Sequence, residues 1–226
     1  MEPEAVDSGV IVERREAVTV VRMERGENRF HPDLLTALES AIDEIAGGEE
    51  PCAFVLTGSG KFFSNGLDLD YMGANPDEAE AILARVHGLF GRVLGLDVPT
   101  VAAINGHAFA AGAMLAISFD LAVMRADRGY FCLPEADIGI PFTPAMNALL
   151  TARMSPPVAH RAMATAHRYP GAEALEAGIV TELADEDEVL DRAVELASGL
   201  AGKPRQAVGA IKRGMYGDVL DLLDAT

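Results

Sequence analysis

The sequence NGHAFAAGAMLA at residues 105–116 consists almost entirely of small and apolar side chains, and it directly follows VPTVAAI at 98–104. The earlier run is short, apolar and rich in β-branched residues, which predicts a buried strand. The later run predicts the start of a helix. Gly106 and Gly112 permit unusual backbone dihedrals or the close approach of another group. So many residues without side-chain chemistry at a strand-to-helix junction indicate that the backbone amides carry the chemistry there.

On both sides of this junction, segments with strand character alternate with segments of helical period. GVIVERR at 9–15 and AVTVVRM at 17–23 predict two neighbouring strands, as in a hairpin. In HPDLLTALESAIDEIAGG at 31–48, apolar residues recur at three- and four-residue steps, which is typical of an amphipathic helix. This alternation predicts an α/β architecture. Further strands are expected at 52–58, 98–104 and 120–126, and further helices at 76–96 and 111–119.

Beyond residue 142 helical patterns dominate the sequence. We therefore predict an α/β core at residues 1–160 and a helical C-terminal region at 161–226. One short additional strand is expected at Gly178-Ile179-Val180. The helices of this part are expected at 141–154, 156–166, 187–202 and 205–217.

The composition argues against several classes of partner. The 226-residue chain has 18 Lys and Arg against 35 Asp and Glu, a formal net charge of -17, so nucleic acid is repelled at long range and is not an expected partner. No window reaches the roughly 18 uninterrupted apolar residues of a membrane span. Acidic residues precede the first apolar run, so we predict no membrane association and a cytoplasmic location. Cys52 and Cys132 lack metal or redox spacing and are expected to be buried thiols.

Common phosphate-loop and metal motifs do not fit this chain. TGSGK at 57–61 begins like a phosphate-binding loop, but Phe62 follows the lysine where Ser or Thr is required. DLDYMG at 68–73 begins like a calcium loop, but Met72 occupies a ligand position. The five histidines show no metal-ligand pairing. We therefore predict no metal site.

Three segments stand out together: FFSNGLDLD at 62–70, NGHAFAAGAMLA at 105–116 and PEADIGIP at 134–141. Taken singly, they are also typical of a turn, a close-packed helix start and a surface loop. In combination they resemble the crotonase superfamily of enoyl-CoA hydratases and isomerases, over roughly residues 10 to 215. The resemblance implies the ClpP/crotonase fold, a spiral of ββα units with a helical C-terminal extension. It also implies that the core at 1–160 holds an acyl-CoA site.

The resemblance implies which residues are catalytic. In the family, the segments that correspond to SNGLD and NGHAFAAG each supply one backbone N–H to an oxyanion hole, and these donors fall on Leu67 and Ala111. The family has glycine at the second position, and alanine keeps the N–H. Glu135 occupies the family's catalytic glutamate position, and its apolar neighbours favour the protonated form, so that it both takes and returns a proton. Asp137 is the rival carboxylate, but its position does not match.

Met114 distinguishes between the reactions of this family. Hydratases use a second glutamate that aligns with Met114, and a thioether neither holds nor deprotonates water. The extra aspartates of dienoyl-CoA isomerases fall at Met114 and Thr143, so that variant is disfavoured too. The resemblance therefore implies a Δ3,Δ2-enoyl-CoA isomerase in which Glu135 alone moves the proton. The alternatives are an enoyl-CoA hydratase or other crotonase-type enzyme that uses Asp68 or Asp70, and a non-catalytic acyl-CoA-binding protein.

Substrate contacts and assembly are implied by the same resemblance. ENRFHPDLL at 27–35 matches the loop along the pantetheine and adenine of CoA, and Arg29 is a candidate to meet a phosphate. CoA is then part of the substrate, and no separate cofactor is expected. Because the family commonly forms trimers, we expect a homotrimer or a dimer of trimers built through residues 161–226. The predicted substrate-binding residues are Asn28, Arg29, Phe30, Asn65, Gly66, Leu67, Asp68, Leu69, Ala111 and Met114.

Overall fold

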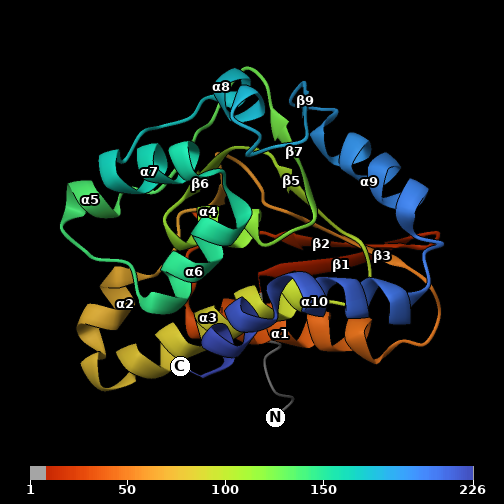
Figure 1. The fold of residues 1–226 in the computed structure, drawn as a ribbon, viewed down its shortest axis with the longest axis horizontal. Coiled ribbons are helices and arrows are strands. Elements are labelled where there is room, and N and C mark those ends of the chain that lie inside the picture. Colours follow the sequence, from red (N-terminus) through yellow and green to blue (C-terminus); the bar gives the residue numbers. More distant parts are fainter. Residues whose placement is uncertain (1–8, 226) are drawn as a thin grey trace, which may run out of the picture.

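The structure, a computed structural model, describes residues 9–225, in which strands and helices alternate along the chain (Figure 1). The strands are β1 (Val10–Arg15), β2 (Val18–Met23), β3 (Ala53–Thr57), β4 (Phe62–Ser64), β5 (Thr100–Ile104), β6 (His107–Phe109), β7 (Leu121–Arg125), β8 (Phe131–Cys132) and β9 (Glu182–Ala184). The first helices are α1 (Pro32–Gly47), α2 (Leu69–Ala74), the 3-10 helix η1 (Pro76–Glu78), α3 (Ala79–Gly95) and α4 (Ala111–Ile117). The later helices are α5 (Glu135–Ile138), α6 (Pro144–Arg153), α7 (Pro156–Thr165), α8 (Gly171–Glu176), α9 (Val189–Leu200) and α10 (Arg205–Asp224).

The larger sheet has six strands in the order β1-β2-β3-β5-β7-β9. β1 and β2 pair in antiparallel orientation with Val10 opposite Met23, which confirms the predicted hairpin. All further pairs are parallel. Parallel neighbours need crossover connections, and α1, α3 and α4 lie in the first three of them. The predicted α/β architecture is confirmed.

The inner strands β2, β3, β5 and β7 are buried on both faces of this sheet, because their side chains alternate between two apolar clusters, whereas the edge strand β1 is largely exposed. Figure 1 shows α9 on one side of the sheet and α1, α3 and α10 on the other. The cluster under α9 includes Val20, Val55, Val101, Val123 and Ala193. The larger cluster on the opposite face includes Val21, Leu35, Phe54, Leu56, Phe90, Ile104 and Met124.

A second sheet of three parallel strands, β4-β6-β8, is absent from the sequence prediction. Its strands have two or three residues each, too few for an alternating pattern. Gly106 makes this sheet possible, because a Cβ there would lie 2.2 Å from the carbonyl oxygen of Lys61. The sheet places the ends of β4, β6 and β8 side by side, so the three segments that carry the family resemblance meet at one edge.

The C-terminal helices share the core of the preceding residues. α9 covers one face of the large sheet, and α10 packs along α3. Tyr216 and Leu220 belong to the larger apolar cluster, and Lys212 Nζ donates a 3.0 Å hydrogen bond to the carbonyl oxygen of Val98. The described residues of 161–226 are therefore mostly helical, with β9 among them, and they form no core of their own.

The last strand lies at β9 and not at residues 178–180. Gly178 has a φ of +71°, so the chain turns there after α8, and pairing with β7 begins only at Glu182. Among the described helices, none combines the length and the apolar character needed to cross a membrane.

Candidate active site

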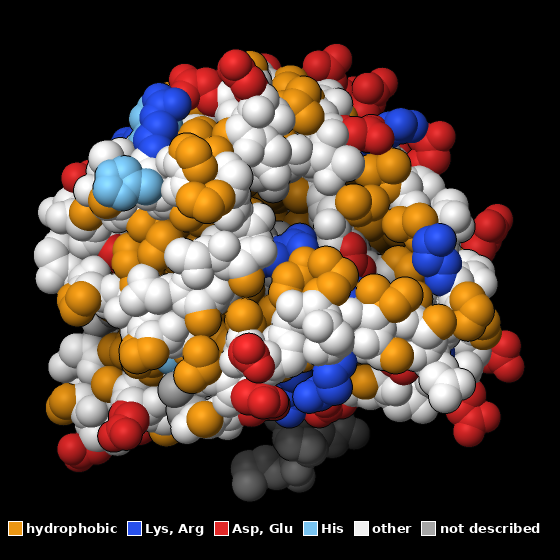
Figure 2. Space-filling view, in the orientation of Figure 1, with side chains coloured by type: hydrophobic (Ala, Val, Ile, Leu, Met, Phe, Trp, Pro, Cys, Tyr) orange, Lys and Arg blue, Asp and Glu red, His pale blue; other side chains and the backbone are white. Residues whose placement is uncertain are grey.

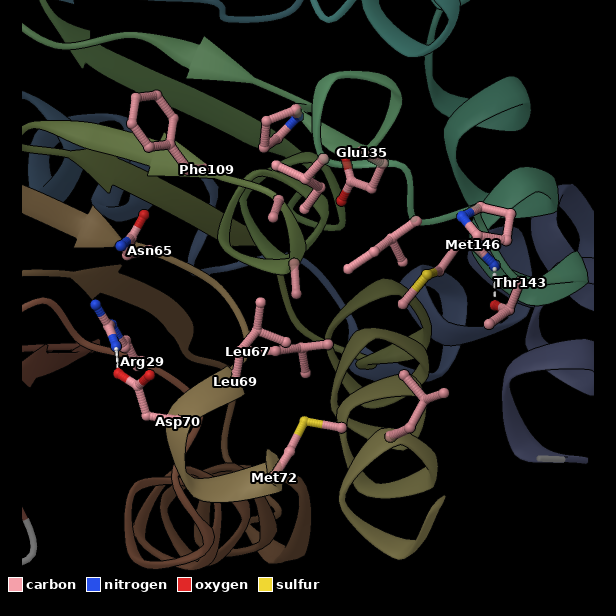
Figure 3. Close-up of a pocket in the computed structure, with 17 residues that line it drawn as sticks. Arg29, Asn65, Leu67, Leu69, Asp70, Met72, Phe109, Glu135, Thr143 and Met146 are labelled. Atoms are coloured by element: carbon pink, nitrogen blue, oxygen red, sulfur yellow. Dashed lines mark hydrogen bonds and ion pairs between the residues drawn. The ribbon is translucent and has the colours of Figure 1, made fainter. Parts of the chain in front are cut away.

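A largely apolar pocket of about 530 Å³ lies among α2, α3, α5, α6 and the start of α4 (Figure 3). This volume is typical of a small-molecule site. Segments 62–70, 105–116 and 134–141 all contribute to its wall. The wall residues are Arg29, Asn65, Leu67, Leu69, Asp70, Met72, Leu83, Phe109, Ala110, Ala111, Pro134, Glu135, Ile138, Ile140, Pro141, Thr143 and Met146.

Glu135 is the buried carboxyl group of this pocket. It is the first residue of α5, a single helical turn, and it is only 6% exposed. Its Oε2 atom is buried and has no hydrogen-bond partner among the described residues. Loss of solvation raises the pKa of Glu135 to about 7, so the group accepts and donates a proton near neutral pH. The neighbouring Asp137 is exposed and is not part of the wall.

Two residues with free backbone amides line the same pocket. Leu67 follows β4 and Gly66, and Ala111 is the first residue of α4. Within the described part of the chain, neither N–H donates a hydrogen bond. The two segments touch: Gly66 has a φ of +81°, and a Cβ on it would lie 3.0 Å from the nitrogen of Ala111. Paired free donors in a poorly solvated pocket are suited to hold a negatively charged oxygen.

The residue before the second amide has a strained backbone. Ala110 has φ 50° and ψ −126°, a combination that glycine adopts far more easily than alanine. Its N–H donates to the carbonyl oxygen of Cys132 at 3.0 Å, and its own carbonyl oxygen accepts from Met114 N at 3.0 Å. These two bonds hold the peptide groups on either side of Ala110, and they therefore fix the orientation of the Ala111 amide.

We expect Ala110→Gly to increase the free energy of unfolding by about 1 kcal/mol. Relief of a strained dihedral is worth roughly 1–3 kcal/mol, and the greater freedom of glycine in the unfolded chain offsets part of this. Urea denaturation measures the change. Ala113→Gly in the helix that follows, α4, is the matched control and is expected to lose about 1 kcal/mol, because residue 113 lies in the helix interior. If both variants lost the same free energy of unfolding, the proposed strain at Ala110 would be contradicted.

The polar end of the pocket is held together by ion pairs. The guanidinium group of Arg29 lies 2.7 Å from a Glu27 carboxylate oxygen and 2.7 Å from one of Asp70. Asn65 donates a 2.9 Å hydrogen bond to Glu27. The hydrogen bonds that Arg29 donates, first to Glu27 and then to Asp70, raise the pKa of Arg29. A phosphate that meets Arg29, as predicted, would therefore meet a guanidinium group already paired with two carboxylates, one of which, Asp70, has a side chain that is 89% exposed.

Five of the predicted substrate-binding residues do not line this pocket. Phe30 and Met114 lie in the apolar core and are at most 1% exposed. Asn28 is buried and donates to carbonyl oxygens of β4, which ties the loop before α1 to the small sheet. Asp68 caps α2 by accepting a backbone hydrogen bond, and Gly66 supplies the close approach described above. The other predicted residues, Arg29, Asn65, Leu67, Leu69 and Ala111, do line the pocket.

Ile138 and Ile140, apolar neighbours of Glu135 in the sequence, line the pocket. The rest of the apolar wall, largely Met72, Leu83 and Met146, was not identified from the sequence. These three are ordinary apolar residues of the helices α2, α3 and α6. Only the packing of α2, α3 and α6 decides that they face a cavity, so a single sequence contains no signal for them.

The comparison with known proteins agrees with this geometry. The sequence model described as Enoyl-CoA hydratase/isomerase matches residues 13–224, and the chain belongs to this family, the crotonase family. The family and fold predictions are confirmed.

Enoyl-CoA delta isomerase 3 of Arabidopsis thaliana is 32% identical over 213 residues, 88% of each chain. The short-chain-enoyl-CoA hydratase of Clostridium acetobutylicum is 32% identical over 228 residues, 94% of this chain and 84% of the relative. A solved structure described as an enoyl-CoA isomerase of Mycobacterium tuberculosis has a TM-score of 0.89 at 30% identity and covers 97% of this chain and 96% of that one.

Proposed function

We propose that this protein isomerises 3-enoyl-CoA to 2-enoyl-CoA, with Glu135 as the only proton carrier and the amides of Leu67 and Ala111 as the oxyanion hole. One observation carries the proposal. Within the described residues, a buried carboxyl group without a partner shares a pocket with two residues whose amides are free. The family and the similarity to an enoyl-CoA delta isomerase support acyl-CoA thioesters as the substrate class.

The proposed reaction moves one proton and no other group. Ionised Glu135 takes a proton from C2, and the electrons of that C–H bond form a dienolate whose negative charge rests on the thioester oxygen. The amides of Leu67 and Ala111 stabilise this charge, and loss of one such donor costs about 3 kcal/mol in known oxyanion holes. The carboxylic acid then returns the proton to C4. The double bond thereby moves from C3–C4 to C2–C3, and Glu135 is ionised again.

The hydratases of this family hold the attacking water with a second glutamate, and the described pocket wall contains no glutamate besides Glu135. Apart from Glu135, the acidic side chain in the described wall is Asp70, which is largely exposed and paired with Arg29. Met114 stands at the place of the hydratase glutamate and lies in the core. A hydratase is the second candidate, because the identity to the clostridial hydratase equals that to the plant isomerase.

An acyl-CoA panel tests the proposal. The wild-type protein is incubated separately with 3-enoyl-CoA and 2-enoyl-CoA of the same chain length, and the products are separated by chromatography. We expect 2-enoyl-CoA from the first substrate and little 3-hydroxyacyl-CoA from the second. Hydration of 2-enoyl-CoA at a rate similar to or above that of isomerisation would contradict the proposal and favour the hydratase.

We expect kcat/KM for isomerisation to rise with pH and to level off above about pH 7. Burial raises the pKa of Glu135 to about 7, and only the ionised form removes a proton, so activity falls as the pH drops below this value. A pH–rate profile with one substrate at low concentration measures the transition. An exposed glutamate would ionise near its ordinary value of 4.5, so a profile that is flat across neutral pH would contradict the buried base.

A further inference from the structure

The pocket has a polar end and an apolar end on opposite sides of Glu135. Arg29, Asn65 and Asp70 gather at one side of the site, and Met146 lies at the other (Figure 3). Apart from Glu135 and the Arg29–Asp70 pair, no charged side chain belongs to the described wall. The charged CoA portion of an acyl-CoA therefore fits the polar end, and its hydrocarbon tail fits the apolar end.

The apolar part of the pocket wall is not fully buried. Three of its side chains are about half exposed: Leu69 at 50%, which lies beside Leu67 (Figure 3), Ile138 at 52% and Ile140 at 45%. We call these three residues the acyl groove. α2, which carries Leu69, buries none of its residues, and α5 buries only Glu135. Figure 2 shows apolar side chains at the surface over the region of α2 and α5, on the left of the view.

The aliphatic side chains of the acyl groove make little contribution to the core of the protein. Clustered apolar side chains at a surface indicate a ligand or partner that covers them. The catalytic pocket is continuous with the groove, because all three residues also line that pocket. This continuity favours the tail of the substrate as the group that covers them.

We propose, on the basis of the isomerisation proposed above, that the substrates are medium- and long-chain 3-enoyl-CoA thioesters whose tails lie in the acyl groove. A closed pocket limits chain length because added methylene groups meet a wall. Here, added methylene groups continue along Leu69, Ile138 and Ile140 and are partly removed from water. Each one therefore strengthens binding.

The expected gain follows from the area that the groove removes from water. Complete burial of one methylene group favours binding by a factor of about four. A groove that is open on one side provides about half of the free energy of complete burial. Affinity is then expected to rise by a factor of about two per methylene. Because binding energy from remote parts of a substrate also acts in the transition state, kcat/KM is expected to rise by about 16-fold over four methylenes.

The wild-type protein is assayed with 3-hexenoyl-CoA, 3-octenoyl-CoA and 3-decenoyl-CoA. In parallel, calorimetry measures the affinity for the saturated hexanoyl, octanoyl and decanoyl thioesters of CoA. We expect both kcat/KM and affinity to increase along each series. If affinity increases but no 3-enoyl-CoA is turned over, the isomerase function fails while the groove assignment stands. If 3-enoyl-CoA is turned over but neither kcat/KM nor affinity increases with chain length, the groove assignment is overturned.

Two single variants identify the groove. Leu69→Asn and Ile140→Asn, on different elements, are each expected to reduce the gain per methylene, so that the decenoyl substrate loses about two- to threefold more kcat/KM than the hexenoyl substrate. Ile211→Asn is the matched control, because Ile211 is 61% exposed on α10 and lies outside the pocket. The control is expected to keep the wild-type chain-length dependence. The proposal would be overturned if both groove variants kept the wild-type dependence of kcat/KM on chain length, or if the control changed this dependence as much as they do.

Discussion

Replacement of Glu135 by glutamine is expected to lower kcat for 3-enoyl-CoA isomerisation by about 10³-fold, within the range of general acid–base catalysis. Glutamine has nearly the same size and fills the same buried position, but its amide cannot take a proton from C2. Oε2 has no hydrogen-bond partner among the described residues, so no neighbouring group is placed to replace it. The rate of 2-enoyl-CoA formation measures the loss.

Asp137→Asn is the matched control for this variant. Asp137 is the other acidic residue of α5, and it is exposed outside the pocket wall, so its replacement is expected to leave the rate near that of the wild type. Glu135→Gln should still bind saturated acyl-CoA, because the free amides and the apolar wall are unchanged. A glutamine variant that retains most of the wild-type rate would contradict the role of Glu135. A wild-type protein that binds acyl-CoA without any turnover would favour the non-catalytic alternative.

Replacement of Ala111 by proline is expected to lower kcat/KM by about 10²- to 10³-fold, the effect of losing one oxyanion-hole donor. Proline has no N–H, and its ring occupies the space where the hydrogen would meet the thioester oxygen. Residue 111 is the first residue of α4, where proline is tolerated in helices. Initial rates at low substrate concentration measure the change.

Two further variants separate the lost N–H from a general disturbance. Ala111→Gly keeps the N–H and is expected to retain most of the activity. A proline restricts the backbone dihedrals of the residue before it, and Ala110 already has a φ of 50°. The double variant Ala110→Gly/Ala111→Pro therefore makes the same test with less backbone strain. Circular dichroism confirms folding in each case. A folded proline variant with the activity of Ala111→Gly would show that this amide does not hold the oxygen.

The positions proposed for catalysis were accessible from the sequence because each belongs to a short continuous segment. Leu67, Ala111 and Glu135 each follow the end of a strand in the small parallel sheet, and the ends of parallel strands meet at one edge. Family resemblance in three separate segments therefore predicts that they converge. The sheet itself escaped prediction, because strands of two or three residues leave no periodic signal.

The surroundings of the catalytic positions could not be predicted in the same way. Met114 aligns with the hydratase glutamate, but its place in the core depends on how α4 packs. Arg29 has the charge to bind a phosphate, yet the fold brings Asp70, 41 residues away along the chain, into contact with it. Leu83 and Met146 are apolar residues of helical stripes, and only tertiary packing separates those that face the pocket from those that fill the core.

The central claim is that one carboxyl group carries a proton from C2 to C4 of the same substrate molecule. The most direct measurement is a single turnover in H₂O of 3-decenoyl-CoA deuterated at C2, with the product analysed by mass spectrometry and NMR. Because Glu135 is buried and its Oε2 has no partner within the described chain, we predict that a substantial part of the deuterium appears at C4. A product whose new C4 hydrogen comes entirely from solvent at the earliest times would contradict the account.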